Sequence, residues 1–329
     1  TSNPSIFMNA VTKSSDYDES LLPLADSKLS AEEVFFTLAI EDIQAATDLF
    51  LPLYEQTNGG DGYVSLEISP YLANETDSSL AQAKELWQRV SRPNLMIKIP
   101  ATKAGIPAIV DAIAAGINVN VTLIFSRERY SEVMDAYLKG LEKRVNNGLA
   151  INTVASVASF FVSRIDTKVD ALLENIIRAG EPKADEARQL LGKAAIASAR
   201  LAYADYKEVF TSDRAESLKK SGAQVQRPLW ASTSTKNPAY RDVVYVEELI
   251  GPDTVNTVPP QTLLAFLDHG QVRASLKENL ETAHKTIADL QDLGISMEEV
   301  TRELEEEGVK SFSDAFTVLL QAIEARRTE

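Results

Sequence analysis

Short apolar segments alternate with longer amphipathic segments along this chain of 329 residues. The short segments are rich in β-branched and aromatic residues and predict strands at residues 63–69, 95–100, 118–125, 153–162, 228–232 and 254–258. The longer segments have helical periodicity and predict helices at residues 5–13, 17–25, 30–56, 78–90, 103–115, 126–146, 165–178, 184–219, 272–293 and 297–327. Because strands and helices alternate, the pattern predicts parallel βα units.

Polar side chains recur at every second position of the apolar strands. Glu67, Lys98 and Asn120 each stand between two aliphatic residues, and alternate residues of a strand point to opposite faces. An open antiparallel sheet would expose such a face to water, but the intervening helices are long enough to cover an outer face. We therefore expect an α/β fold, a TIM (β/α)8 barrel with additional helices, as a single domain over residues 1–329 whose polar positions point inward.

The inward positions predict one shared cavity at the carboxyl ends of the strands. A lysine in an apolar strand can instead mark an exposed sheet edge, which is the ordinary interpretation of Lys98 taken alone. Inside a barrel with a carboxylate beside it, a lysine is suited to covalent amine chemistry with a carbonyl substrate. The positions assigned to the cavity are Glu67, Lys98, Asn120, Thr122, Ser159 and Ser232, and Trp230 has the same parity as Ser232.

Composition argues against several other classes of function. Lys and Arg number 33 against 48 Asp and Glu, and the net charge of -15 disfavours nucleic acid and anionic membranes as partners. An anionic substrate would therefore need a local basic pocket. The chain has no cysteine, and its only histidines are His269, expected in a connection, and His284, expected on a helix. It thus has little material for a zinc set or a Ser-His-Asp triad, and we expect no metal site and no role for either histidine.

Two further patterns concern the surface and the location of the protein. The acidic cluster within residues 303–307 runs round an expected helix and predicts a solvated face. The N-terminus has no basic region followed by an apolar one, and no apolar run of about 18 residues occurs. This pattern predicts a cytoplasmic protein.

Five segments in a fixed order resemble the transaldolase family, specifically its longer bacterial type, over nearly the whole chain. They read Thr-Ser-Asn-Pro-Ser at residues 1–5, Leu-Met-Ile-Lys-Ile-Pro-Ala-Thr at 95–102, Asn-Val-Asn-Val-Thr-Leu-Ile-Phe-Ser at 118–126, Ser-Phe-Phe-Val-Ser-Arg at 159–164 and Leu-Trp-Ala-Ser-Thr-Ser-Thr-Lys-Asn at 229–237. The order of the segments makes the resemblance specific, whereas the lysine strand alone would not.

The resemblance implies a role for each matching position. Lys98 would form a Schiff base with the ketone of a ketose phosphate, and Glu67 with Thr122 would hold the water that shuttles protons. Arg164 and Ser232 would bind phosphate. In the shorter transaldolases an arginine lies two residues after that serine, and here Lys236 is expected to be the second cation. The implied substrate-binding residues are Asn3, Asn120, Ser159, Phe161, Arg164, Ser232 and Lys236.

The implied activity is that of a transferase of the pentose phosphate pathway without metal or cofactor. It would move a dihydroxyacetone unit from sedoheptulose 7-phosphate or fructose 6-phosphate to an aldose phosphate. The partners are then sugar phosphates, and the resemblance leaves open a monomer or a homodimer. Two alternatives remain, namely a Schiff-base aldolase that releases free dihydroxyacetone and a sugar-phosphate-binding barrel with impaired catalysis.

The start of the sequence motivates the second alternative. The family has an aspartate at the end of its first barrel strand, and this sequence begins after that strand, so that residues 1–3 look like the tail of another one. A barrel that lacks one strand leaves two sheet edges unpaired. We therefore expect the chain alone to be poorly stable and weakly active, and an upstream segment with a strand and an aspartate to restore both properties.

Overall fold

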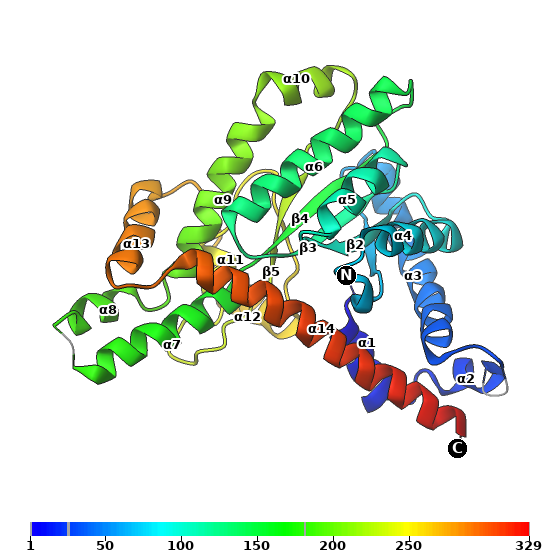
Figure 1. The fold of residues 1–329 in the computed structure, drawn as a ribbon, viewed down its shortest axis with the longest axis horizontal. Helices are drawn as coiled ribbons and strands as arrows, with labels where there is room; N and C mark the ends of the chain where they lie inside the picture. The colour runs from blue at the N-terminus through cyan, green and yellow to red at the C-terminus, as the bar shows by residue number, and fades with distance from the viewer. Residues whose placement is uncertain (1, 25–26, 181, 329) are drawn as a thin grey trace.

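Six parallel strands form one sheet in the order in which they occur along the chain (Figure 1). The computed structural model describes residues 2–24, 27–180 and 182–328. Its strands are β1 (Val64–Glu67), β2 (Leu95–Pro100), β3 (Val119–Ile124), β4 (Ser156–Phe161), β5 (Arg227–Ala231) and β6 (Val255–Asn256). All six predicted strands are confirmed: β2 has the predicted bounds, β5 is shifted by one residue towards the N-terminus, and the other four are shorter than predicted. The curled parallel sheet surrounded by helices has the architecture of a TIM-barrel-like α/β fold.

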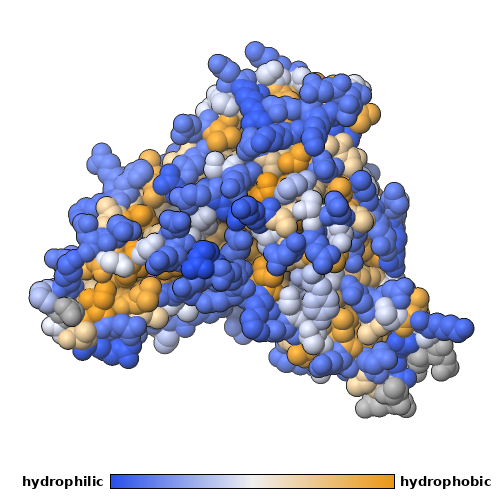
Figure 2. Space-filling model, in the orientation of Figure 1, coloured by the Kyte–Doolittle hydropathy of each residue, from blue (hydrophilic) through white to orange (hydrophobic). Residues whose placement is uncertain are grey.

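Helices connect successive strands and pack round the sheet (Figure 1). The helix α3 begins with a capping box, in which Ser30 Oγ accepts from the main-chain N–H of Glu33 and the Glu33 carboxylate accepts from the N–H of Ser30. The face seen in Figure 2 is mainly hydrophilic, with scattered apolar residues. The helices are α1 (Pro4–Lys13), α2 (Asp18–Leu21), α3 (Ala31–Gln56), α4 (Thr76–Val90), α5 (Gly105–Ala114), α6 (Arg127–Asn146), α7 (Ser163–Ala179), α8 (Ala184–Leu190), α9 (Ala194–Phe210), α10 (Asp213–Lys220), α11 (Val244–Glu247), α12 (Pro260–His269), α13 (Leu280–Asp292) and α14 (Met297–Thr328).

Three expectations about helices need correction. The segment 184–219 is not one helix but α8, α9 and α10, because Gly192 has a left-handed backbone with φ of +69° and Ser212 caps a new helix. The helix expected at 272–293 starts only at Leu280. The preceding α12 was not expected, and consequently His269 ends a helix instead of lying in a connection.

The residues before α1 do not belong to a strand. Asn3 is the N-cap of α1, and its Oδ1 accepts a hydrogen bond from the main-chain N–H of Ile6 at 2.8 Å. Ser2 lies alongside β1, where its Oγ donates to the main-chain oxygen of Ser65 at 2.8 Å. The expected strand tail at 1–3 is therefore wrong for residues 2 and 3, and residue 1 lies outside the described residues.

The long helix α14 is tied to the helices that begin where β3 and β4 end (Figure 1). Arg129, near the start of α6, contacts Glu305 at 3.2 Å. Lys168 of α7 contacts Glu303 at 2.7 Å and Glu307 at 2.6 Å. The acidic cluster is largely exposed, as its sequence predicted, and three of its carboxylates also pair with cations of α6 and α7.

Asp166 of α7 is a buried carboxylate, only 1% exposed. Its two oxygens accept hydrogen bonds from the main-chain N–H of Ala195 and from the hydroxyl of Tyr245, both at 2.7 Å. Hydrogen bonds to a carboxylate favour its charged form, whereas burial disfavours that form. Burial is the larger effect here and raises the pKa of Asp166 to about 6.

A raised pKa means that Asp166 stabilises the fold in acid. This contribution is complete below the unfolded pKa of about 3.8 and is lost as the pH rises through about 6. We expect the free energy of unfolding to lose about 1.4 kcal/mol from this group between about pH 5 and pH 7, and the Asp166→Asn variant to lack that loss. Urea titrations of both proteins across this range measure the difference, and parallel pH profiles would contradict the expectation.

Candidate active site

Lys98 and Glu67 form a buried ion pair on adjacent strands. The two residues are register partners of β2 and β1, and Nζ lies 2.9 Å from Oε2. Lys98 is 6% exposed and Glu67 is 7% exposed. The Lys98 ammonium also donates to the main-chain oxygen of Ser2 at 3.0 Å. The structure thus brings together the lysine and the carboxylate that the alternation of side chains placed on one face.

The surroundings of this pair change the acidity of Glu67. Burial raises the pKa of the Glu67 carboxyl, and the Lys98 ammonium acts in the opposite direction. Because burial is the larger effect, the carboxyl holds a proton more readily than a glutamate in water does. A carboxyl of this kind can exchange a proton with the amine beside it and serve as a general acid and base.

Hydroxyl and amide groups extend the polar site across β1, β3 and β4. Asn120 is the register partner of Lys98 on β3. Its Nδ2 donates to Ser65 Oγ at 3.0 Å, and its Oδ1 accepts from Ser159 Oγ at 2.7 Å. Sequence reasoning assigned Asn120 and Ser159 but missed Ser65, although Ser65 has the same parity as Glu67. No local signal marked Ser2, whose contacts join residues far apart in the chain.

Thr122 is buried and keeps a hydroxyl without a partner. It is 1% exposed, and its Oγ1 makes no hydrogen bond within the described residues. A bulge follows, because Thr122 and Leu123 together lie opposite Ser159, and Leu123 has a φ of +60°. The bulge shifts the alternation, so that Phe125 meets the ring of Phe161 at 5.1 Å between centroids.

Arg164 is a half-buried cation at the start of α7. Its guanidinium carbon lies 5.6 Å from the centroid of the Phe161 ring, a cation–π contact. Burial lowers the pKa of Arg164 below its usual range. The charge of Glu307 acts in the opposite direction, but that carboxylate pairs with Lys168 at 2.6 Å. A desolvated arginine at the end of a barrel strand has the properties of an anion-binding group.

The parity expected for the fifth strand is wrong. Ser159 pairs with Leu229, so Leu229 shares the inner face and Trp230 lies on the outer one, where its ring meets Phe160. Ser232 follows the strand with a φ of +58°. This left-handed backbone brings Ser232 Oγ to 2.9 Å from Ser163 Oγ, at the start of α7. Ser232 therefore lies beside Ser163, the residue before Arg164, and its hydroxyl contacts that serine instead of Lys98 or Glu67.

Lys236 and Asn3 lie at the edges of this region. Lys236 is exposed in the loop after β5, and its ammonium donates to Ser234 Oγ at 2.7 Å. Asn3 uses its side-chain oxygen to cap α1, and it lines with Glu67 a cavity of about 10 Å³ that also touches Phe316 of α14. Such a volume is about that of one water molecule.

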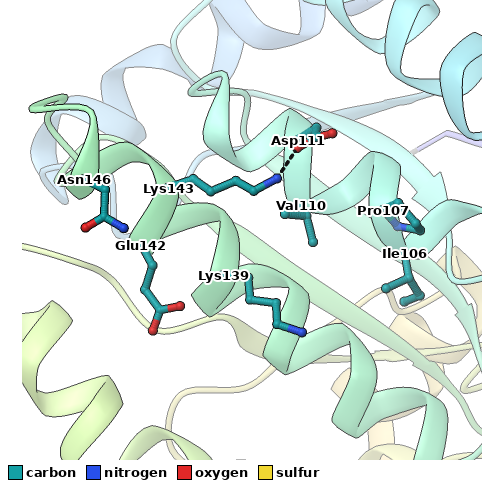
Figure 3. A pocket seen from close by; sticks show the side chains of 8 residues that line it. All are labelled: Ile106, Pro107, Val110, Asp111, Lys139, Glu142, Lys143 and Asn146. Carbon is teal, nitrogen blue, oxygen red and sulfur yellow. Dashed lines mark hydrogen bonds and ion pairs between the residues drawn. The ribbon is translucent and has the colours of Figure 1, made fainter.

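A larger groove of about 470 Å³ lies between α5 and α6 on the outside of the sheet (Figure 3). Its two lysines are already paired, Lys143 with Asp111 at 2.7 Å and Lys139 with Asp135 at 2.7 Å. It contains no strand residue and none of the polar positions described above. We therefore assign the chemistry to the interior pair and not to this groove.

In the described ranges no cluster of three or more His, Cys, Asp or Glu side chains is arranged to hold a metal ion. His269 instead contacts Asp242 at 2.9 Å and Asp268 at 3.1 Å near the surface. None of the helices in the described part of the chain combines the length and the apolar character that crossing a bilayer requires.

A buried amine beside a carboxylate in a parallel α/β barrel is typical of enzymes that bind carbonyl substrates covalently. A family model described as Transaldolase/Fructose-6-phosphate aldolase matches residues 1–323. Transaldolase of Mycolicibacterium smegmatis is 50% identical over 327 residues, which cover 99% of this chain and 86% of the relative. Transaldolase 2 of Streptomyces coelicolor (326 residues) and transaldolase of Mycobacterium tuberculosis (327 residues) are each 48% identical, again with 99% and 86% covered.

The chain therefore belongs to the transaldolase/fructose-6-phosphate aldolase family. Its curated relatives are named transaldolases, which are enzymes of the transferase class. The transaldolase interpretation of the sequence is thereby confirmed.

Proposed function

We propose that this chain carries a dihydroxyacetone unit on Lys98 from a ketose phosphate to an aldose phosphate. The observation that carries the proposal is the buried contact of 2.9 Å between Lys98 Nζ and Glu67. An amine that can pass its proton to a neighbouring carboxyl is free to attack a carbonyl carbon. The reaction requires neither metal nor cofactor, because the lysine supplies the nucleophile and, as a protonated imine, the electron sink.

The chemistry proceeds through two imines. The Lys98 nitrogen attacks the ketone, and the resulting carbinolamine loses water to give a protonated imine. The bond between the α and β carbons of the imine then breaks. Its electron pair forms an enamine, the hydroxyl on the β carbon loses its proton, and an aldose phosphate leaves. The enamine attacks the acceptor aldehyde, which takes up a proton, and water hydrolyses the second imine. Glu67, 2.9 Å from Lys98, would move protons in the carbinolamine steps, and the hydroxyl of Thr122, which has no partner among the described residues, would hold the water involved.

The dihydroxyacetone unit would be held by the polar groups around this pair. Asn120 is bonded on both sides, to Ser65 and to Ser159, and therefore offers a fixed amide next to Lys98. Fixed groups lose little freedom when a substrate binds. Asn3 would reach the same unit from the start of α1, and the Phe161 ring would form a wall of the pocket.

The phosphate would bind at the start of α7. Arg164 supplies a half-buried guanidinium, and the hydroxyl of Ser232 lies beside Ser163, the residue before it. Lys236 in the loop after β5 would be a second cation, with a smaller effect because it is exposed. A chain of net charge -15 repels an anionic substrate. A local pair of cations would offset this repulsion at the binding site.

We also propose a single barrel domain, because the family match runs through residues 1–323 without a break. A place in the pentose phosphate pathway and a cytoplasmic location follow from the proposed reaction, since its substrates are sugar phosphates.

The test of the reaction type uses sedoheptulose 7-phosphate with and without glyceraldehyde 3-phosphate. A transaldolase forms fructose 6-phosphate only when the acceptor is present. Release of free dihydroxyacetone in the absence of an acceptor would instead identify an aldolase. Protection of the chain against thermal unfolding by the donor, with no product in either mixture, would identify a barrel that binds sugar phosphate without turnover.

Arg164→Ala is expected to raise KM for fructose 6-phosphate by about 10- to 100-fold, the loss typical of hydrogen bonds to a charged group. The KM of a donor without phosphate should change little, because it makes no such bond. Steady-state kinetics with both donors measure the ratio. Arg178→Ala, which removes an exposed arginine from the same helix, is the matched control. Equal increases of KM for both donors would show that Arg164 does not bind phosphate.

A further inference from the structure

The helix α7 binds two tyrosines of the segment after β5 through two carboxylates one turn apart. Asp170 accepts hydrogen bonds from the hydroxyl of Tyr240 at 2.6 Å and from the main-chain N–H of Gly192 at 2.9 Å. Asp166 binds the hydroxyl of Tyr245 at 2.7 Å and a main-chain N–H of α9. Each carboxylate therefore joins one tyrosine to the chain around the start of α9.

The ring of Tyr240 packs against Gly192, in addition to the hydrogen bond made by its hydroxyl. A Cβ atom added at Gly192 would lie 2.7 Å from Tyr240 Cζ, closer than side chains tolerate. The glycine therefore leaves the space that the ring occupies. With main chain against its face and Asp170 at its hydroxyl, Tyr240 can take few other positions.

The tyrosines continue the same segment that carries the proposed phosphate-binding groups. This segment begins at Ser232, whose hydroxyl and main-chain oxygen contact the hydroxyl and N–H of Ser163 at 2.9 and 3.0 Å. It is thus attached to α7 at its start and again at Tyr240 and Tyr245, with Lys236 between these attachments. Arg164 belongs to the same first turns of α7.

The surroundings of the two aspartates indicate that they fix the position of the segment after β5 more than they stabilise the fold. Asp166 is 1% and Asp170 is 6% exposed, and no ion pair with a cation is recorded for either one among the described residues. Buried carboxylates without a cation are costly, so apolar residues would serve stability equally well. A hydrogen bond to a carboxylate is short and directional, and two of them fix both the distance and the orientation of a loop.

We propose that Tyr240 and Tyr245, through Asp170 and Asp166, are positioning residues that hold the segment after β5 against α7 at the spacing needed to bind one phosphate between Arg164 and Ser232. This inference rests on the proposed function and deepens it. It implies that loss of either tyrosine hydroxyl weakens binding of phosphorylated substrates and leaves the chemistry at Lys98 largely unchanged.

The experiment compares Tyr240→Phe and Tyr245→Phe with the wild-type chain. Each variant is expected to raise KM for fructose 6-phosphate about 3- to 10-fold, with kcat and the KM of a donor without phosphate nearly unchanged. Tyr137→Phe is the matched control, because it removes a buried hydroxyl that bonds main-chain oxygens at the amino ends of β4 and β5. Even with a loss of thermal stability equal to that of the other variants, its KM should not rise.

Asp170→Asn is a second test of the positioning role, since it keeps the shape of the side chain and removes the charge. Its effect on KM should not add fully to that of Tyr240→Phe in the double variant, because both changes weaken the same contact between Tyr240 and Asp170. This inference alone would be overturned by the following combination of results: the enzyme is active, Arg164→Ala raises KM for phosphorylated donors, and the tyrosine and Asp170 variants leave KM unchanged. Equal losses for donors with and without phosphate would also overturn it. A wild-type chain without turnover would overturn the proposed function and this inference together.

Discussion

Lys98→Arg is expected to abolish both turnover and covalent capture of substrate carbon. A guanidinium stays protonated and cannot form an imine, so the fall in kcat should be at least about 10⁴-fold, as for the loss of other nucleophiles. Treatment of the wild-type chain with fructose 6-phosphate and borohydride should add a three-carbon unit to the peptide that contains Lys98. The variant should gain none, as measured by mass spectrometry.

Lys103→Arg is the control for this experiment, because Lys103 follows the same strand but lies at an exposed position. It should keep both turnover and labelling. Modification of Lys103 in the wild-type chain, or undiminished labelling of the Lys98→Arg variant, would show that the nucleophile is a different lysine.

Glu67→Gln is expected to lower kcat by about 10²- to 10⁴-fold, the range that a positioned general acid or base contributes. The amide can still accept a hydrogen bond from Lys98, but it cannot take up a proton. Borohydride should therefore still trap substrate carbon on Lys98, although more slowly. Rapid-quench measurements of trapping separate this result from a loss of the nucleophile.

The pH dependence of the same variant gives an independent check. Because burial raises the pKa of Glu67, the acid limb of kcat/KM in the wild-type chain should lie at higher pH than for an ordinary glutamate. Removing the titrating group should remove that limb in Glu67→Gln. Glu75→Gln, at an exposed position shortly after β1, should leave rate and pH profile unchanged. A limb that persists in Glu67→Gln would assign it to another group.

The strands and the pair of Lys98 and Glu67 could be predicted from the sequence, because both depend on the local alternation of apolar and polar residues. Six apolar segments separated by helices predict parallel βα units. The structure has all six strands in that order. Glu67, Lys98 and Asn120 all belong to extended strands, Glu67 as the last residue of β1, and Lys98 is the register partner of the other two. Reading parity along one strand was sufficient there, because nothing interrupts the extended backbone.

The same reasoning failed where the backbone leaves the extended region. Leu123 and Ser232 both have positive φ, and neither is a glycine whose presence would have warned of it. Beyond Leu123 the inner face passes to Phe125, and at Ser232 the chain turns toward Ser163 instead of the interior pair. The aspartates of α7 were missed for a related reason, since their tyrosine partners lie about 70 residues or more away in sequence.

The sequence by itself determined the α/β class, the positions of the strands and the presence of a lysine and a carboxylate on one inner face, because these follow from periodicities of two and 3.6 residues. Only the tertiary structure decided that Ser2 and Ser65 join this site, that Arg164 lies half-buried against the Phe161 ring, and that α7 holds the segment after β5. These features are contacts between residues distant in the chain. They depend on register, bulges and left-handed turns, which no local pattern of apolar and polar residues specifies.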